Sequence, residues 1–164
     1  MAPAVAFKKA ARLLEPDGLV HLMTYVPIRD GGPSDAASRV SAKVRAHFGA
    51  REKVRLPDTY ASVVKRVKRC REDFSAGWAS LELGDEADWP GRAEAFEADT
   101  LLCRRVSLTW SLEKHVRYAH SYGAFLGLDD AAAAEAAYRR ELARACGSRI
   151  TRCFAAVALT ARRR

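Results

Sequence analysis

Residues 12–26 read RLLEPDGLVHLMTYV, and this stretch decides the predicted fold. Pro16 ends the helix that precedes it, and the Asp-Gly pair that follows is typical of turns. Leu19–Val26 then forms a nearly continuous apolar run of strand length, which indicates a strand buried on both faces. Residues 4–14 place apolar side chains at helical spacing. A helix, a short turn and a buried strand predict half of a β-α-β unit, and hence an α/β protein.

Two more helices are predicted in the first half of the chain. Ser34 or Asp35 caps one, and Asp58 or Thr59 caps the other, because each lies just before apolar residues at helical spacing. Residues 74–98 are the least regular part of the sequence.

The second half of the chain predicts two strands separated by two helices. The elements are a strand at 99–110, helices capped by Ser111 and by Asp129 or Asp130, and a last strand at 150–159. Gly147 is expected to end the second helix. The basic residues 162–164 are expected to be a frayed end.

Composition limits the class of protein. Hydrophobic residues make up 49% of the 164 residues and charged residues 29%, which is typical of a globular protein rather than a disordered one. No run approaches the roughly 20 apolar residues that a membrane span needs, and no signal peptide is evident. We therefore expect a cytoplasmic protein that makes no membrane contact.

The four cysteines indicate a reducing compartment. Cys70, Cys103, Cys146 and Cys153 contain no CxxC pair and have no histidine at zinc-ligand spacing. We expect four buried or half-exposed free thiols and no metal site.

A basic run leaves a second function open. Residues 65–71 read KRVKRCR, and the chain carries a net charge of +8. A solvated helix face is the main interpretation, and a phosphate contact is the alternative. The alternative would make the chain a non-catalytic basic module that binds nucleic acid or an acidic partner. Nucleic acid is the less favoured partner because few aromatic residues interleave with the basic ones.

Three segments, taken in order, resemble the second half of class I S-adenosylmethionine-dependent methyltransferases. The turn RLLEPDG at 12–18 is similar to the R-v-L-k-P-g-G-type turn before their fifth strand, with Asp17 where the family usually has glycine. The segment WSLEKHVRYAHSYGA at 110–124 resembles the small-molecule methyltransferases related to trans-aconitate methyltransferase. Residues 141–159 resemble that group's last helix and closing strand.

The resemblance implies a partial Rossmann-like sheet. It would hold the last strands of the family's sheet, including the closing antiparallel hairpin, with helices inserted after strand 5 and between the last two strands. The chain would be one partial domain. Residues 1–27 would form a helix and strand 5, residues 28–98 an inserted helical and irregular region, and residues 99–164 the last two strands with helices between them.

The resemblance also implies a function. Full-length relatives transfer a methyl group from S-adenosylmethionine to a small molecule, typically a carboxylate. This chain contains no G-x-G-x-G loop, which the backbone needs in order to approach the cofactor. We therefore expect an inactive or truncated methyltransferase-like chain that does not bind S-adenosylmethionine by itself. Half a sheet would also expose an edge for self-association or a complementing subunit.

Four residues are candidates for contact with the methyl acceptor. Tyr25 ends a predicted strand, where open α/β sheets bind ligands. Tyr118 and Tyr122 lie four apart on one helix face, and Tyr122 occupies the family's aromatic position. His120 is the fourth candidate. Packing is the alternative for Tyr25, Tyr118 and Tyr122. The hydroxyl residue that follows the aromatic in relatives is replaced by Gly123.

The remaining histidines are given structural roles. His21 is expected to be a satisfied core histidine, and His115 to pack or lie at the surface. No catalytic residue is predicted, because methyl transfer relies on the cofactor's sulfonium and on alignment rather than on a protein nucleophile.

Overall fold

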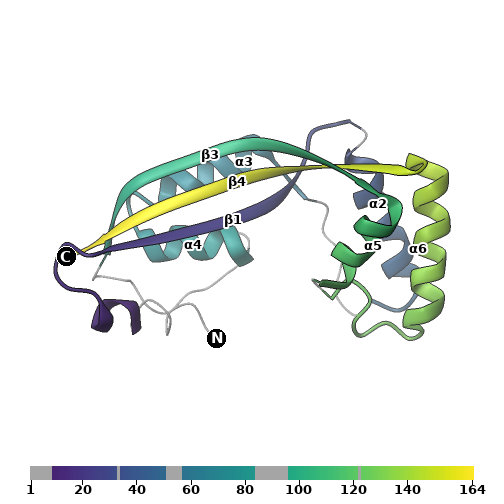
Figure 1. Cartoon of the computed structure of the whole chain (residues 1–164), viewed down its shortest axis with the longest axis horizontal. Helices are drawn as coiled ribbons and strands as arrows, with labels where there is room; N and C mark the ends of the chain where they lie inside the picture. The colour runs from purple at the N-terminus through teal and green to yellow at the C-terminus, as the bar shows by residue number, and fades with distance from the viewer. Residues whose placement is uncertain (1–8, 33, 51–56, 84–95, 122) are drawn as a thin grey trace. The chain divides into compact units, whose positions relative to one another are not determined.

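The computed structural model describes residues 9–32, 34–50, 57–83, 96–121 and 123–164. These residues form a mixed α/β fold around an open four-stranded sheet of order β2-β1-β4-β3 (Figure 1). The strands are β1 (Leu19–Arg29), β2 (Asp58–Thr59), β3 (Phe96–Ser111) and β4 (Arg149–Arg163). The helices are α2 (Ser34–His47), α3 (Tyr60–Arg69), α4 (Phe74–Leu83), α5 (Leu112–Ser121) and α6 (Ala131–Cys146), and residues 9–13 are also helical. The α/β class predicted from the sequence is confirmed.

Strand β4 runs antiparallel to both of its neighbours. Beside the start of β1, the Arg163 N–H donates to the Gly18 carbonyl over 2.8 Å, so the end of β4 meets the beginning of β1. Beside the end of β3, the hydroxyls of Thr109 and Thr151 lie 3.0 Å apart, so the beginning of β4 meets the end of β3. The sheet's one parallel pair is therefore β1 with the two-residue β2.

The chain divides into two compact units. The first comprises residues 1–26, 59–106 and 154–164, and the second comprises residues 27–58 and 107–153. Helices α3 and α4 belong to the first unit, and helices α2, α5 and α6 belong to the second.

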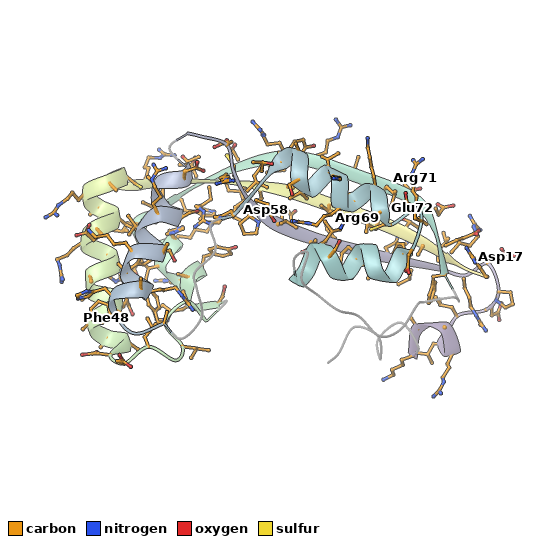
Figure 2. All side chains as sticks on the ribbon, turned by 180° about the vertical axis from the view of Figure 1, so that it is seen from behind. Asp17, Phe48, Asp58, Arg69, Arg71 and Glu72 are labelled. Carbon is orange, nitrogen blue, oxygen red and sulfur yellow. The ribbon has the colours of Figure 1, made fainter. Side chains whose placement is uncertain are left out.

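In the first unit, α3 and α4 lie on one face of the sheet. They stand behind the strands in Figure 1 and in front of them in the reverse view of Figure 2. Val157, Leu159 and Ala161 alternate along β4 and are almost completely buried, as expected for the face that packs against helices. The two helices come very close at Gly77, where a Cβ would lie 2.6 Å from the Cys70 backbone nitrogen.

The opposite face corrects one prediction. Strand β1 was expected to be buried on both faces, but its side chains alternate between half-buried and exposed along 19–25. Met23 is 68% exposed and Tyr25 is 53% exposed. This apolar run therefore forms a strand that is covered on one face only. Its composition reflects β propensity and does not show whether a second layer of structure covers the other face.

The second unit has its own apolar core. Helices α2, α5 and α6, the loop after α5 and the beginning of β4 contribute its buried side chains. They are Ala37, Val40, Val44, Val116, Ala119, Ala124, Phe125, Ala134, Tyr138, Leu142 and Ile150.

The predicted helix boundaries are largely confirmed. Thr59, Ser111 and Asp130 stand at the beginnings of α3, α5 and α6, and each side chain accepts a hydrogen bond from the backbone N–H three residues later. Helix α6 ends at Gly147, which has φ 71°. Local capping chemistry is short-range, so it can be read from the sequence.

Helix α4 was missed in the stretch expected to be irregular. Phe74, Trp78 and Leu81 lie at helical spacing and are buried. Gly77 and the small residues around it lowered the helical signal. The glycine is nevertheless needed there, because α3 passes against it.

Three smaller expectations were also wrong. Strand β1 continues through Pro27 to Arg29 instead of ending before the proline. Arg162 lies within β4 and pairs with Asp99 over 3.1 Å, so this basic end is not frayed. His21 is exposed, and its Nδ1 lies 2.9 Å from the Thr160 hydroxyl, so it is not a core histidine.

The thiol prediction is confirmed. All four cysteines are free, with Cys70 and Cys153 buried and the other two half-buried. Over the ranges that the structure describes, no helix is both long enough and apolar enough to span a bilayer.

Candidate functional site

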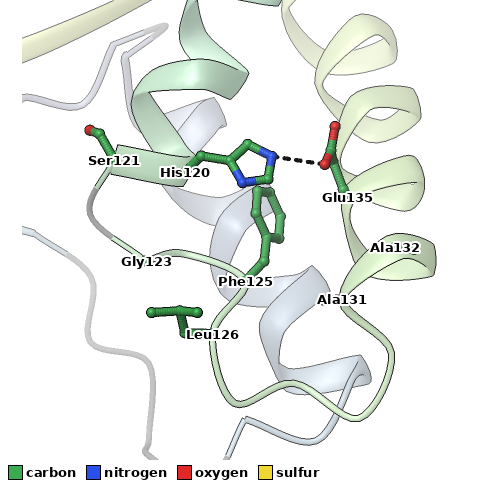
Figure 3. Close-up of a pocket in the computed structure, with 8 residues that line it drawn as sticks. All are labelled: His120, Ser121, Gly123, Phe125, Leu126, Ala131, Ala132 and Glu135. Carbon is green, nitrogen blue, oxygen red and sulfur yellow. Dashed lines mark hydrogen bonds and ion pairs between the residues drawn. The ribbon is translucent and has the colours of Figure 1, made fainter.

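A pocket of about 370 Å³ lies in the second unit, between the end of α5 and the beginning of α6 (Figure 3). Its lining comes from the last turn of α5, the loop that follows and the first turns of α6. The residues are His120, Ser121, Gly123, Phe125, Leu126, Ala131, Ala132 and Glu135. Most of the lining is apolar, and His120 and Glu135 supply its ionisable groups.

His120 and Glu135 face each other in this pocket (Figure 3). The His120 Nε2 lies 2.8 Å from Glu135 Oε2, and the imidazole packs on Phe125 with ring centroids 4.9 Å apart. The pair joins two helices, because His120 is in the last turn of α5 and Glu135 is in the second turn of α6. Packing and the hydrogen bond together orient the ring.

An arginine keeps Glu135 ionised. Arg139 Nε donates to Glu135 over 2.8 Å, and Arg139 Nη1 donates to Glu113 over 2.6 Å. The hydrogen bonds from Arg139 and then His120 lower the pKa of the Glu135 carboxyl. A hydrogen-bonded histidine–carboxylate pair can accept a proton or hold a donor group of a ligand.

The loop on the other side of the pocket depends on Gly123. Its φ is +72°, which side-chain-bearing residues rarely adopt, and a Cβ there would lie 2.9 Å from the Leu126 Cδ1. Leu126 is 79% exposed at the rim. Gly123 therefore has a backbone role in this loop.

Of the three predicted site residues that the structure describes, His120 alone lines the pocket. Tyr118 is half-buried and packs on Trp110 and His115, with ring centroids 4.9 and 6.3 Å away, which fits the packing alternative. Tyr25 lies in the first unit, where its ring meets Phe154 edge-on at 6.5 Å. Tyr122 lies outside the described residues.

Aromatic rings connect the pocket to the interior of the second unit. Phe125 of the pocket meets Tyr138 at 5.6 Å between ring centroids. Tyr138 meets His115 at 6.2 Å, and its hydroxyl lies 3.1 Å from His115 Nε2. Trp110 also stacks on His115, with ring centroids 5.7 Å apart. His115 is therefore a core residue, and the surface alternative for it was wrong.

Sequence reasoning missed Glu135 as a pocket residue. It stands in an alanine-rich helix with an arginine four residues later, a spacing that indicates a surface ion pair. Only the packing of α5 beside α6 brings it to His120. Nothing in the local sequence could have shown this contact.

The basic run at 65–71 is split by the fold. Lys65, Lys68, Arg69 and Arg71 are exposed, as a solvated helix face requires, and Figure 2 shows Arg69 and Arg71 at the end of α3. Arg66 is buried. The main interpretation of this run is confirmed for its exposed members.

No protein-family model matches this chain, and no curated protein shows significant similarity to it. The part of the chain that the structure describes holds no group of three or more side chains suited to bind a metal ion.

Proposed function

We propose that this chain is the acceptor-binding half of a class I S-adenosylmethionine-dependent methyltransferase domain. The observation that carries the proposal is the strand order β1-β4-β3, with β4 antiparallel between two strands that share a direction. The resemblance at 12–18, 110–124 and 141–159 implies a closing antiparallel hairpin among the last strands of the family's sheet, and the antiparallel pair of β3 and β4 agrees with it. Helices after β1 and between β3 and β4 also follow the implied order.

The free edge of β1 supports the same proposal. Strand β1 has 11 residues, but on the side away from β4 the described chain offers only the two-residue β2 as a partner. This short pair is parallel, as a further strand of a Rossmann-like sheet would be. The edge is therefore where a cofactor-binding half would continue the sheet.

In this proposal the pocket at His120 holds the methyl acceptor. The ionised Glu135 and the imidazole favour a small molecule that donates a hydrogen bond, such as an alcohol or amine, over the bare carboxylate that the resemblance implies. His120 would then take the acceptor proton as the methyl group arrives. The rest of the catalysis is alignment and exclusion of water, supplied by the apolar lining.

Calorimetry tests the cofactor half of the proposal. The purified chain should not bind S-adenosylmethionine, because its 164 residues contain no glycine-rich loop. Binding should appear when the cofactor-binding half of a trans-aconitate methyltransferase-like enzyme is added and pairs with β1. Micromolar binding by the chain alone would contradict the proposed division, and failure of the two halves to associate would contradict the strand assignment.

Thermal shift with a panel of small alcohols and amines tests the acceptor half. A ligand of the pocket should stabilise the wild-type chain and stabilise Glu135→Gln less. Glu141→Gln is a matched control, because Glu141 lies on the same helix outside the pocket and pairs with Lys43. Equal shifts in both variants would show that the ligand does not use Glu135.

A further inference from the structure

One face of the sheet in the first unit is open and carries large apolar side chains. Met23 and Tyr25 of β1 are 68% and 53% exposed, and Leu102 of β3 is 45% exposed. Helices α3 and α4 lie on the other face, where Val157 and Leu159 of β4 are buried (Figure 1). Isolated exposed apolar side chains are ordinary, whereas a contiguous group of them marks an interaction surface.

The register between β1 and β4 brings the first two of these side chains onto one surface. The His21 Nδ1 lies 2.9 Å from the Thr160 hydroxyl, so these two residues stand opposite each other. Residues two apart on a strand share a face, and an antiparallel pair keeps them opposite residues two apart on the neighbouring strand. Met23 therefore lies beside Ala158, with Tyr25 next along β1 on the same face.

Strand β3 adds the third apolar side chain from the other side of β4. The Ser107 hydroxyl and the Cys153 thiol lie 3.2 Å apart, so these residues are opposite each other. Counting along the two strands from this pair puts Leu102 beside Ala158, with Arg104 two residues nearer to the pair. Leu102 and Arg104 are exposed, whereas the residue between them is half-buried, as expected if both point to the open face.

Smaller and polar side chains complete this surface, which we call the open face. Along β4, the residues that alternate with the buried ones are half-buried and have small side chains: Ala156, Ala158 and Thr160. They form a low row between the larger side chains of β1 and β3. At the end of the face nearest to His21, Arg162 donates to the Asp99 carboxylate over 3.1 Å. The open face is therefore apolar in the middle and polar at this end.

Two copies of the open face complement each other. A two-fold axis parallel to the strands would set β1 of one copy over the low row of β4 in the second copy, beside that copy's β3. Met23 would then meet Leu102 of the second copy. Tyr25 would meet Arg104 of the second copy, whose guanidinium can lie over the ring. The symmetry forms each contact twice, which favours a second copy of this chain as the partner.

We propose that the open face is a dimer interface, at which the sheets of two copies pack face to face. The polar end fits the same arrangement, because His21 would lie beside Asp99 of the second copy and a ring N–H can donate to that carboxylate. The contact is distinct from the edge of β1, because it uses side chains of the face and not backbone groups. It depends on neither methyl transfer nor the complementing half.

Sedimentation velocity of the full chain between about 1 and 200 µM tests the interface. A salt concentration of about 0.3 M screens the repulsion between two chains that each carry a net charge of +8. The wild-type chain should shift from monomer to dimer across this concentration range. Met23→Lys and Leu102→Glu should each weaken the dimer about tenfold or more, because each sets a charge against an apolar side chain.

Mixing the two variants tests which strands face each other. In a mixed dimer the introduced lysine of one chain meets the introduced glutamate of the other, and the second contact keeps the wild-type side chains. An equimolar mixture should therefore form a dimer at concentrations where neither variant does so alone. Leu126→Lys is the matched control, because Leu126 is 79% exposed but lies in the second unit, and this variant should associate like the wild type.

Four results would overturn the proposal. A wild-type chain that stays monomeric over the whole range would do so, and so would dimers that both charge variants leave unchanged. An equal loss of association in Leu126→Lys would indicate a general effect of charge. A mixture that stays monomeric would show that β1 and β3 of the two copies do not meet. Circular dichroism checks folding, and Met23→Ser and Leu102→Ser replace any charge variant that does not fold.

Discussion

Acidification should destabilise the second unit through one side chain, His115. This imidazole is fully buried, lies 3.1 Å from the Tyr138 hydroxyl and stacks on Trp110. Burial, followed by the charge of Arg152, lowers its pKa from 6.5 to about 4. The folded chain therefore binds this proton only near pH 4, whereas the unfolded chain binds it at its ordinary pKa.

The direction and size of this pH effect on stability follow from proton linkage. As the pH falls, the unfolded state binds the proton before the folded state does. The stability that the neutral His115 gives to the fold is therefore complete above pH 6.5 and is lost as the pH falls from 6.5 toward 4. Between pH 7.5 and pH 5, the free energy of unfolding should fall by about 2 kcal/mol from this residue alone. The carboxyl groups of Glu113 and Glu135 have lowered pKa values, so their effect on stability appears below this pH range. Stopping at pH 5 therefore isolates the effect of the histidine.

Urea unfolding at a series of pH values measures this effect. Tryptophan fluorescence reports on the region, since Trp110 stacks on the ring. The His115→Gln variant should be less stable than the wild type at pH 7.5. Its free energy of unfolding should not show the fall of about 2 kcal/mol between pH 7.5 and pH 5. His47→Gln, which removes an exposed histidine, should keep it. An unchanged pH profile in His115→Gln would refute the reasoning.

Two further predictions concern the first unit. Gly77→Ala should cost about 1–3 kcal/mol, although alanine usually stabilises a helix interior, because the new Cβ would meet the Cys70 backbone. Urea unfolding followed by fluorescence checks this, and a variant as stable as the wild type would contradict it. Burial raises the pKa of the Cys70 thiol to about 12, so iodoacetamide at pH 8 should label Cys103 and Cys146 before Cys70 in the folded chain. Peptide mass spectrometry distinguishes the order, and early labelling of Cys70 would exclude a closed α3–α4 interface.

The candidate sites show how far local sequence reaches. His120 was predicted from its place in a segment that resembles a family, and the structure places it in a pocket. Glu135, its partner there, lies 15 residues away and carried no signal of its own. The burial of Arg152 also gave no signal, because an isolated arginine in a strand reads the same in the sequence whether it is buried or exposed.

The sequence by itself determined the elements whose causes are short-range. Caps at Thr59, Ser111 and Asp130, the stop at Gly147 and the apolar runs of the long strands depend on residues within a few positions of one another. Such interactions act before the chain has folded, so pattern reasoning finds them.

Only the tertiary structure decided which faces are covered and which polar groups meet. The run Leu19–Val26 became a strand with one exposed face because α3 and α4 pack on one side only. Gly77 lies where the end of α3 leaves no room for a Cβ. Burial and pairing are sums over residues far apart in the chain. The exposed face of β1, the His120–Glu135 pair and the buried Arg152 could therefore appear only once the elements were packed.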